Sequence, residues 1–144
     1  MPQSISDLSQ ADQARVEAQR AWVRGHFTPG SEGLYNQLHQ KLRLLDTIIK
    51  NRWIDPKETV KLQSLGIAFG DALVEKIGLH WVAVEDEYGR DPALRYKGTS
   101  IIAFPLTMIS KRIERGEAVD VYKLFDGVCS ALEKQIEREG RGEQ

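Results

Sequence analysis

The chain has 144 residues, a formal net charge of −1, and hydrophobic and charged contents of 41% and 28%. This composition is ordinary for a globular protein, and the length suits one domain over residues 1–144 that buries about 68–70% of its unfolded surface. Acidic and basic residues are mixed in every segment, which argues against the basic stripe of a nucleic-acid-binding protein. The single cysteine, Cys129, excludes an internal disulfide and a multi-cysteine zinc site. Its apolar helical surroundings predict a buried, unreactive thiol.

The N-terminal segment is polar and shows no apolar signal-peptide core. No apolar run reaches the length of a membrane span either, so we expect a cytoplasmic protein without a membrane partner. Residues 1–8 are expected to be loose. Ser9 to His26 is predicted to be a first helix, which the loop residues at 28–31 end. Residues 1–30 could therefore be a helical arm appended to the rest of the domain.

A second helix is predicted from Leu34 to Trp53. Its apolar residues recur every three or four positions, on a stripe wide enough for contact on two sides. They are Leu34, Leu38, Leu42, Leu44, Leu45, Ile48 and Ile49. Several basic side chains also lie along this helix. A solvated face explains them better than an anionic partner does, because no aromatic residues are interleaved for base stacking.

The third predicted helix has a complete start signal at Asp55. This residue suits the N-cap, Pro56 suits the first helical position, and Glu58 completes a capping-box spacing. Gly78 marks the predicted end of the helix. The apolar face consists of Leu62, Leu65, Phe69, Leu73 and Ile77.

Two glycines, Gly66 and Gly70, interrupt the third helix. Each costs roughly 1 kcal/mol against alanine inside a helix, so a compensating contact is expected. Close packing of another element against the bare backbone is the favoured interpretation. Close approach of a ligand to the backbone is the alternative.

Three strands are predicted after this helix, forming an antiparallel meander. The first runs from His80 to Tyr88, and residues 89–92 form a turn. The second strand is Leu94 to Lys97, and the third is Ser100 to Phe104. Because the third strand is apolar on both faces, we expect it to lie deepest. Pro105 ends it, since proline cannot donate a ladder hydrogen bond.

Two helices are predicted to close the chain, from Leu106 to Arg115 and from Val119 to Glu139. Gly127, in the last helix, is a second place where a neighbour could pack closely. The predicted class is therefore α+β, with three N-terminal helices, a three-stranded antiparallel meander and two C-terminal helices packed on the sheet. The predicted core includes Phe69, Leu73, Val82, Ile102, Ile109 and Leu124.

No motif for catalysis or for a cofactor is recognisable. The three histidines, His26, His39 and His80, lack the spacing of metal ligands. The chain also contains no GxGxxG, Walker or GxSxG motif. We therefore predict no catalytic residue, no metal and no cofactor.

The most distinctive polar feature is the acidic run Glu85, Asp86 and Glu87 at the end of the first strand. Alternation places Glu85 and Glu87 on one face. A solvated strand end, a partner-binding edge, and an acid/base pair or cation site are three interpretations of this run. The bases Arg112 and Arg115 share a helix face; they could pair with the acidic strand end or hold an anionic group.

Two strings, LGIAFGDALVEKIGLHWVAVEDEYGRDPALRY and SIIAFPLTMISKRIERGE, resemble the bacterial domain-of-unknown-function family 3806. The resembling features are the glycines at 66 and 70, the strand from Trp81 to Gly89, and the segment from Phe104 to Glu117. The resemblance spans about residues 57–137. It implies a bacterial, cytoplasmic protein and no particular activity.

Two functional hypotheses follow. The first is a non-enzymatic protein-binding module, for example an immunity-type or chaperone-like protein. Its partner surface would comprise Trp81, Glu85, Glu87, Tyr88, Arg112 and Arg115. The alternative is an enzyme or small-molecule-binding protein that uses Glu85 and Glu87 with Arg112 and Arg115 on an anionic ligand. A homodimer is a further possibility, because three tryptophans leave room for an exposed apolar patch.

Overall fold

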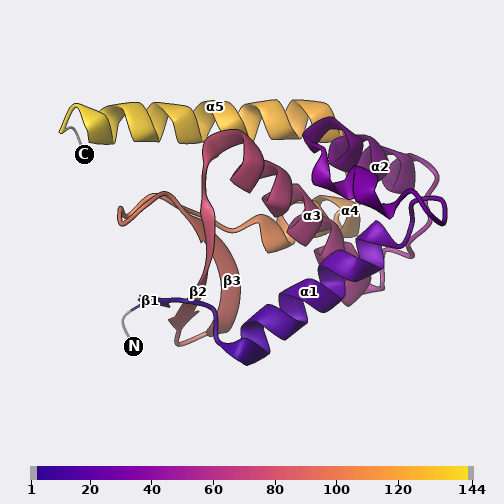
Figure 1. Ribbon diagram of the computed structural model, residues 1–144, viewed down its shortest axis with the longest axis horizontal. Helices are drawn as coiled ribbons and strands as arrows, with labels where there is room; N and C mark the ends of the chain where they lie inside the picture. Colours follow the sequence, from indigo (N-terminus) through magenta and orange to yellow (C-terminus); the bar gives the residue numbers. More distant parts are fainter. Residues whose placement is uncertain (1–2, 143–144) are drawn as a thin grey trace.

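The computed structural model describes residues 3–142 and has a mixed α+β architecture (Figure 1). A four-stranded antiparallel sheet has the order β1-β2-β3-β4, and α3 runs through the centre of the helical layer. The elements are β1 (Ser4–Ser6), α1 (Gln10–Arg24), the 3₁₀ helix η1 (Glu32–Asn36), α2 (Leu38–Lys50), α3 (Thr59–Ile77), β2 (His80–Asp86), β3 (Gly89–Arg95), β4 (Ile102–Ala103), the 3₁₀ helix η2 (Pro105–Thr107), α4 (Ser110–Glu114) and α5 (Val121–Gly140). The predicted α+β class is confirmed. Within the described range, no helix is long and apolar enough to cross a bilayer.

The N-terminal segment contributes a strand that the sequence did not predict. Ile5 of β1 lies opposite Val84 of β2, and Ser6 lies opposite Ala83. The expectation that residues 1–8 are loose is therefore wrong for Ser4–Ser6, while residues 1–2 lie outside the described part. A strand of three residues is too short to show alternation of apolar and polar side chains in the sequence. It is recognised only in the structure, where it pairs with the edge of β2.

The hairpin turn between β2 and β3 differs from the predicted one. Asp86 pairs with Gly89, so Glu87 and Tyr88 form a two-residue loop, and residues 89–92 belong to β3. The Asp86 carboxylate accepts a hydrogen bond from the backbone N–H of Tyr88 at 2.8 Å. Gly89 has a φ of 138°, a value that favours glycine. The sequence predicts the turn at residues 89–92 because Gly, Asp and Pro are common in turns. The strand pairing instead places the turn two residues earlier, at Glu87 and Tyr88.

The third predicted strand is short and lies at the sheet edge. Only Ile102 and Ala103 form β4, which pairs with Arg95 and Leu94. Ile102 is half-buried and Phe104 is exposed, so the expectation that this strand lies deepest is wrong. An edge strand has a neighbour on one side alone, which leaves part of its apolar surface uncovered.

The helix boundaries also shift. Ser9 and Asp12 form a capping box at α1, with hydrogen bonds of 2.8 and 3.1 Å. The predicted second helix is divided into η1 and α2, because the backbone at Gln37 is extended. Helix α3 starts at Thr59 rather than near Asp55, whose carboxylate instead accepts from the backbone N–H of Lys57 at 2.8 Å.

The C-terminal helices follow the prediction in part. They are predicted to pack on the sheet, whereas α4 packs mainly against α3 and η2, and α5 packs mainly against α2 and α3. The segment predicted to be one helix from Leu106 is η2 followed by the five-residue α4. Helix α5 begins after Asp120, whose side chain accepts from the backbone N–H of Lys123 at 3.1 Å. Gly78 ends α3 in the left-handed conformation, as predicted.

The core is built around α3, which packs against α1, α2, α5 and η2. Four of the predicted core residues, Phe69, Leu73, Val82 and Ile109, are buried, while Ile102 and Leu124 are half-buried. The rings of Phe69 and Phe125 meet edge to face with centroids 5.7 Å apart. This pair joins α3 to α5.

The glycines of α3 mark a close approach between elements, as predicted. A Cβ at Gly66 would lie 2.4 Å from the carbonyl oxygen of Pro105, and one at Gly70 would lie 2.6 Å from the Trp81 ring. Close packing therefore accounts for both glycines. The same expectation for Gly127 is wrong, because a Cβ there would meet no atom within 4 Å.

Candidate functional site

A hollow beside the helical core lies between α2, α3 and the segment that joins α4 to α5. We call it the α2–α3 hollow; its volume is about 670 Å³, within the range of ligand pockets. Its apolar lining consists of Ile48, Ile49, Ile54, Pro56, Leu62, Leu65, Ile113, Ala118 and Val119. Leu62 and Leu65 are among the most buried residues of the core. The floor of the hollow is therefore formed by residues of the hydrophobic core.

Charged residues surround this apolar lining, and most of them are already paired. Lys50 forms an ion pair with Asp46 at 2.9 Å, and this contact raises the pKa of the Lys50 ammonium. Glu117 pairs with Arg115 at 3.5 Å. Asp55 holds the backbone of its own loop, as described above. The carboxylates at the rim are therefore engaged within the chain.

Arg52 is the exception, and its backbone is unusual. Helix α2 ends in a Schellman motif, in which the N–H of Arg52 donates to Ile49 and that of Trp53 donates to Ile48. The motif needs a left-handed residue, and Arg52 has a φ of 52°. Glycine is the usual residue at this position because it has no Cβ to clash.

Two exposed aromatic residues are close in sequence to residues that line the hollow: Trp53 lies between Arg52 and Ile54, and Tyr122 follows Val119 by three positions. Trp53 is 53% exposed, and its ring stacks on His26 at a centroid distance of 6.2 Å. Tyr122 is 43% exposed and lies one residue after Val121, at the start of α5. Exposed tryptophan, tyrosine and arginine are the residue types that dominate protein-binding hot spots.

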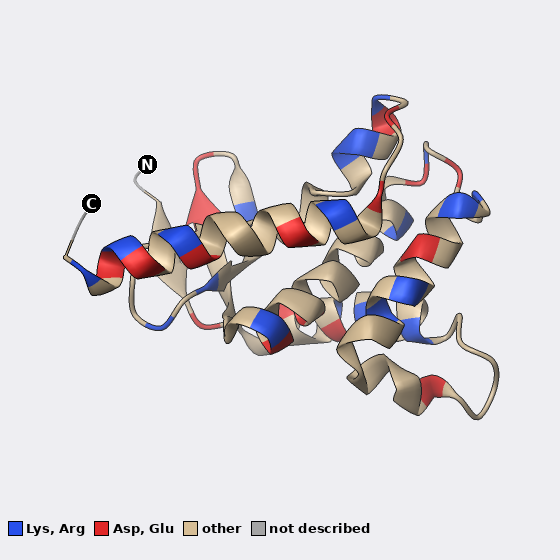
Figure 2. Cartoon of the chain, turned by 90° about the horizontal axis from the view of Figure 1, so that it is seen from above, with Lys and Arg blue, Asp and Glu red and all other residues tan. Residues whose placement is uncertain are grey.

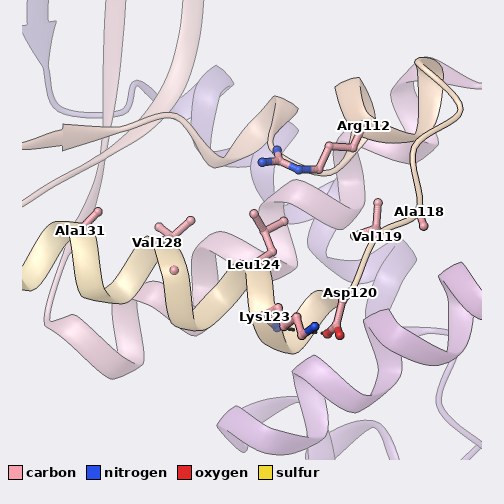
Figure 3. A pocket seen from close by; sticks show the side chains of 9 residues that line it. Arg112, Ala118, Val119, Asp120, Lys123, Leu124, Val128 and Ala131 are labelled. Carbon is pink, nitrogen blue, oxygen red and sulfur yellow. Dashed lines mark hydrogen bonds between the residues drawn. The ribbon is translucent and has the colours of Figure 1, made fainter.

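A second hollow, which we call the α4–α5 groove, has a volume of about 490 Å³ and shares Ala118 and Val119 with the first. Figure 3 shows Arg112 reaching from α4 across the face of α5 that carries Leu124. The Arg112 guanidinium donates to the carbonyl oxygen of Met108 at 2.9 Å. Gly127 also lines the groove, whose space explains why no neighbour packs against this glycine.

Two of the predicted site residues make internal contacts. The indole N–H of Trp81 donates to Asp71 at 3.0 Å, and the ring packs on Gly70. Glu85 pairs with Arg90 at 3.2 Å, and the same guanidinium binds Asp12 of α1 at 2.6 Å. Glu85 thus helps to attach the N-terminal helix to the sheet.

The other predicted site residues are dispersed. Glu87 and Tyr88 form the tip of the β2–β3 hairpin, where Tyr88 is 89% exposed. Arg112 and Arg115 belong to the α4 region, which lies away from this hairpin in both Figure 1 and Figure 2. No residue of β2 lines either hollow. The structure therefore does not bring the acidic strand end and the two arginines together.

Sequence reasoning missed a polar cluster around Asp71 on α3. Arg20 donates to its two carboxylate oxygens at 2.6 and 2.8 Å, and the Tyr35 hydroxyl donates at 2.5 Å. Trp81 supplies a further donor. Burial and the adjacent carboxylate raise the pKa of the Tyr35 phenol above its usual value. With these donors satisfied, the cluster joins α1, η1 and β2 to α3.

A buried lysine lies beside this cluster. The Lys41 ammonium donates to the carbonyl oxygen of Tyr35 at 2.6 Å and pairs with Glu75 at 3.1 Å. It also lies 4.9 Å from the centroid of the Tyr35 ring. The signal in the sequence was a lysine within the apolar stripe of α2, which indicates a buried partner rather than a solvated base.

Reactive groups are scarce around the two hollows. Cys129 is buried, as predicted, and burial raises the pKa of its thiol to about 11. At neutral pH this thiol is therefore protonated and weakly nucleophilic. No cluster of three or more His, Cys, Asp or Glu side chains in the described part could hold a metal ion.

The comparison with protein families decides the affiliation of the chain. The model of a domain of unknown function, DUF3806, matches residues 41–125, from α2 to the first turns of α5. The chain belongs to the DUF3806 family. The matched region of this DUF3806 chain contains every residue that lines the α2–α3 hollow. It excludes Arg20 and Tyr35, which lie in the N-terminal part of the Asp71 cluster.

A solved structure shows that the fold recurs elsewhere. The DUF3806 chain superposes with a TM-score of 0.71 on a crystal structure of a protein from Bacteroides thetaiotaomicron, at 15% sequence identity. The alignment covers 89% of this chain and 47% of that one, so the chain spans about half the length of that protein. This likeness concerns the fold alone. A comparison with curated proteins gives no match.

Proposed function

We propose that this DUF3806 chain is a non-enzymatic binding module that holds a segment of another protein in the α2–α3 hollow. The observation that carries the proposal is the combination of an open apolar hollow with exposed Trp53, Tyr122 and Arg52 beside it. Such hollows take an apolar anchor side chain, and aromatic residues and arginine around them supply most of the binding energy.

Binding is favoured over catalysis by the lining itself. The side chains of the hollow include no His, Cys, Ser, Thr or Tyr among the described residues. Asp55 and Glu117 are its only carboxylates, and each is exposed and already holds a partner. A general acid or base needs a poised group within reach of a substrate, and neither residue meets that requirement.

The neighbouring α4–α5 groove extends the proposed surface. Ala118 and Val119 form the ridge between the two hollows, since both residues line each of them. A partner segment with two apolar side chains could therefore place one on each side of the ridge. An immunity-type or chaperone-like role in a bacterial cytoplasm, as suggested by the sequence, fits such a surface and forms part of this proposal.

A second candidate surface is the tip of the β2–β3 hairpin. Its supporting observation is Tyr88, which is the most exposed of the large hydrophobic side chains in the described part. Glu87 stands beside it in the loop. Charge reversal at Glu85 is an unsuitable test of this surface, because it would break the contact with Arg90. Tyr88→Ser tests the hairpin tip without touching a buried contact.

Affinity capture with blocked variants tests the proposal. The tagged protein is used to retain partners from the lysate and the secreted fraction of its host, and mass spectrometry identifies them. Ala118→Trp places a large ring over both hollows, while Ala14→Trp on the exposed side of α1 adds the same ring elsewhere. The proposal predicts a stoichiometric partner that wild type and Ala14→Trp retain and Ala118→Trp loses.

Each alternative result has a clear meaning. Equal capture by Ala118→Trp would show that neither hollow is the binding surface. Loss of the partner from Tyr88→Ser, with retention by Ala118→Trp, would move the surface to the hairpin tip. Thermal unfolding of every variant confirms that the lost binding does not come from a lost fold.

A further inference from the structure

We propose that the bound partner segment presents a carboxylate to Arg52, next to the apolar side chain that fills the α2–α3 hollow. This inference rests on the proposed function and specifies the chemistry of the partner: an acidic, apolar segment of a protein. Its basis is the conformation of Arg52, the pairing of the charges around it, and the apolar surface beside it.

The ends of α2 and α4 line the same hollow, at Arg52 and Gly116. Helix α4 ends in a Schellman motif in which Gly116 has a φ of 77°, with hydrogen bonds from Gly116 to Ile113 and from Glu117 to Arg112. Helix α2 ends in the same motif with Arg52 at the equivalent position. A side chain in the left-handed region is strained, so glycine would be the more stable residue at position 52.

In the part of the chain that the structure describes, the Arg52 guanidinium has no polar contact that would compensate for this strain. Among the described residues, the Arg52 side chain forms no hydrogen bond and no ion pair, although its backbone completes the motif. No hydrogen bond or ion pair of the Arg52 side chain in this part of the chain therefore offsets the strain. Strained residues of this kind concentrate at binding sites, where the side chain acts on a ligand.

The charged side chains around Arg52 indicate which charge a partner should carry. Asp55 and Glu117, the carboxylates that line the hollow, are engaged by the Lys57 backbone and by Arg115. Lys123, at the α4–α5 groove, is a second base whose ammonium has no hydrogen bond or ion pair among the described residues. Asp120, which also lines the groove, accepts from the backbone N–H of Lys123. Each carboxylate that lines the two hollows therefore already accepts a hydrogen bond, whereas the Arg52 and Lys123 side chains donate none to a described residue, and this difference favours a carboxylate on the partner.

The exposed aromatic surface near the hollow favours a protein segment as the occupant. The hollow alone could hold a small apolar acid, but Trp53 and Tyr122 expose further aromatic surface beside it. A peptide segment covers such surface, whereas a ligand confined to the hollow leaves it in water. An aromatic or aliphatic residue with a neighbouring Asp or Glu meets all of these requirements.

Peptide display provides an unbiased test. Random dodecapeptides on phage are selected on the immobilised full-length protein, after binders of Ala118→Trp have been removed. We expect the surviving peptides to combine a large apolar residue with a nearby Asp or Glu. Selection on Arg52→Gly is expected to lose the acidic preference. Lys57→Gln, which removes an exposed neighbouring charge outside the hollow lining, is expected to retain it.

Affinity measurements on one selected peptide complete the test. Replacing its acidic residue by the amide is expected to weaken binding to wild type about fivefold, the scale of a partly exposed ion pair. The same replacement should have little effect on binding to Arg52→Gly, because the two groups act as one pair. Thermal unfolding of Arg52→Gly confirms that the variant is folded.

The outcomes separate this inference from the proposed function. Apolar peptides without an acidic preference, or an acidic preference that persists on Arg52→Gly, would overturn the carboxylate inference and leave the hollow as a binding site. Enrichment of Lys or Arg would also overturn it. Failure to obtain any peptide that depends on an open hollow would overturn both proposals.

Discussion

The guanidinium of Arg20 holds the carboxylate of Asp71 through two parallel hydrogen bonds of 2.6 and 2.8 Å, across 51 positions of the sequence. This bidentate pair fastens α1 to the central helix α3. Tyr35 and Trp81 donate to the same carboxylate. These hydrogen bonds to Asp71, which we call the polar staple, therefore connect the N-terminal arm to the region matched by the family model.

Replacing Asp71 by asparagine should weaken this staple strongly. The change removes the partly buried charge that Arg20 faces and leaves a partly buried guanidinium paired, among the described residues, only with the exposed Glu17, so we expect a loss of about 3 kcal/mol in the free energy of unfolding. Urea denaturation measures the loss. Glu17→Gln is the matched control, because it removes exposed ion pairs with Arg20 and Arg24 that are each worth about 0–1 kcal/mol. Equal effects of the two changes would contradict a staple at Asp71.

Truncation of Phe69 should show that α3 is the centre of the core. Phe69 is fully buried and meets Phe125 edge to face, so Phe69→Ala should cost about 3–5 kcal/mol. Leu124, on the same helix as Phe125, is half-buried, and Leu124→Ala should cost clearly less. Denaturant melts measure both values. A cost below about 1 kcal/mol for Phe69→Ala would mean that the core rearranges around the lost ring.

The two kinds of helical glycine should respond in opposite directions to alanine. At Gly66 the new methyl group would overlap the backbone of Pro105, so Gly66→Ala should destabilise despite the better helix propensity of alanine. At Gly127 the methyl group meets open space, and Gly127→Ala should stabilise by up to about 1 kcal/mol. The pair is compared by thermal unfolding. Stabilisation by Gly66→Ala would show that η2 can move away from α3.

Arg52→Gly should stabilise the fold although it removes a surface charge. Glycine relieves the strain of the left-handed conformation, but it also gives the unfolded chain more conformational freedom. The net gain in the free energy of unfolding should be about 0.5–1 kcal/mol. Asn51→Gly is the control, because Asn51 has an ordinary φ of −86° and should lose stability. A stabilised variant that no longer prefers acidic peptides would identify position 52 as a compromise between stability and binding. Destabilisation by Arg52→Gly would show that its side chain contributes to the fold.

Acid should release the contact between α1 and the sheet. Hydrogen bonds from Arg90 and from the Ser9 backbone hold the pKa of the Asp12 carboxyl well below its usual value. In the unfolded chain this group protonates near its ordinary pKa of about 3.9. Its stabilising contribution is therefore present above that pH and is lost as the pH falls through it and below.

The corresponding measurement is the melting temperature of wild type and Asp12→Asn between neutral pH and pH 2. The difference between the two proteins should be largest near neutral pH and should shrink in acid. In the Arg90→Gln background, the difference in melting temperature caused by Asp12→Asn should be smaller. The Arg90→Gln substitution removes the hydrogen bond that is the largest cause of the lowered Asp12 pKa. A difference that stays constant over the whole range would show that the charge of Asp12 does not contribute to the stability of the fold.

Local signals in the sequence determined much of this protein. The apolar face of α3, the end of that helix at Gly78, the close approach at Gly66 and the burial of Cys129 were all predicted, because each depends on residue types within a few turns or on one backbone conformation. The resemblance to the DUF3806 family rests on the same stretches of sequence.

The tertiary structure alone decided the rest. The strand β1 forms because β2 offers it an edge, and Glu85 pairs with its cross-strand neighbour Arg90, which also binds Asp12 of α1. The α2–α3 hollow is assembled from segments between residues 48 and 119, and no local pattern reports a gap between them. Local propensities act over three or four residues, whereas these features depend on which distant surfaces meet during packing, and that is settled only when the whole chain is folded.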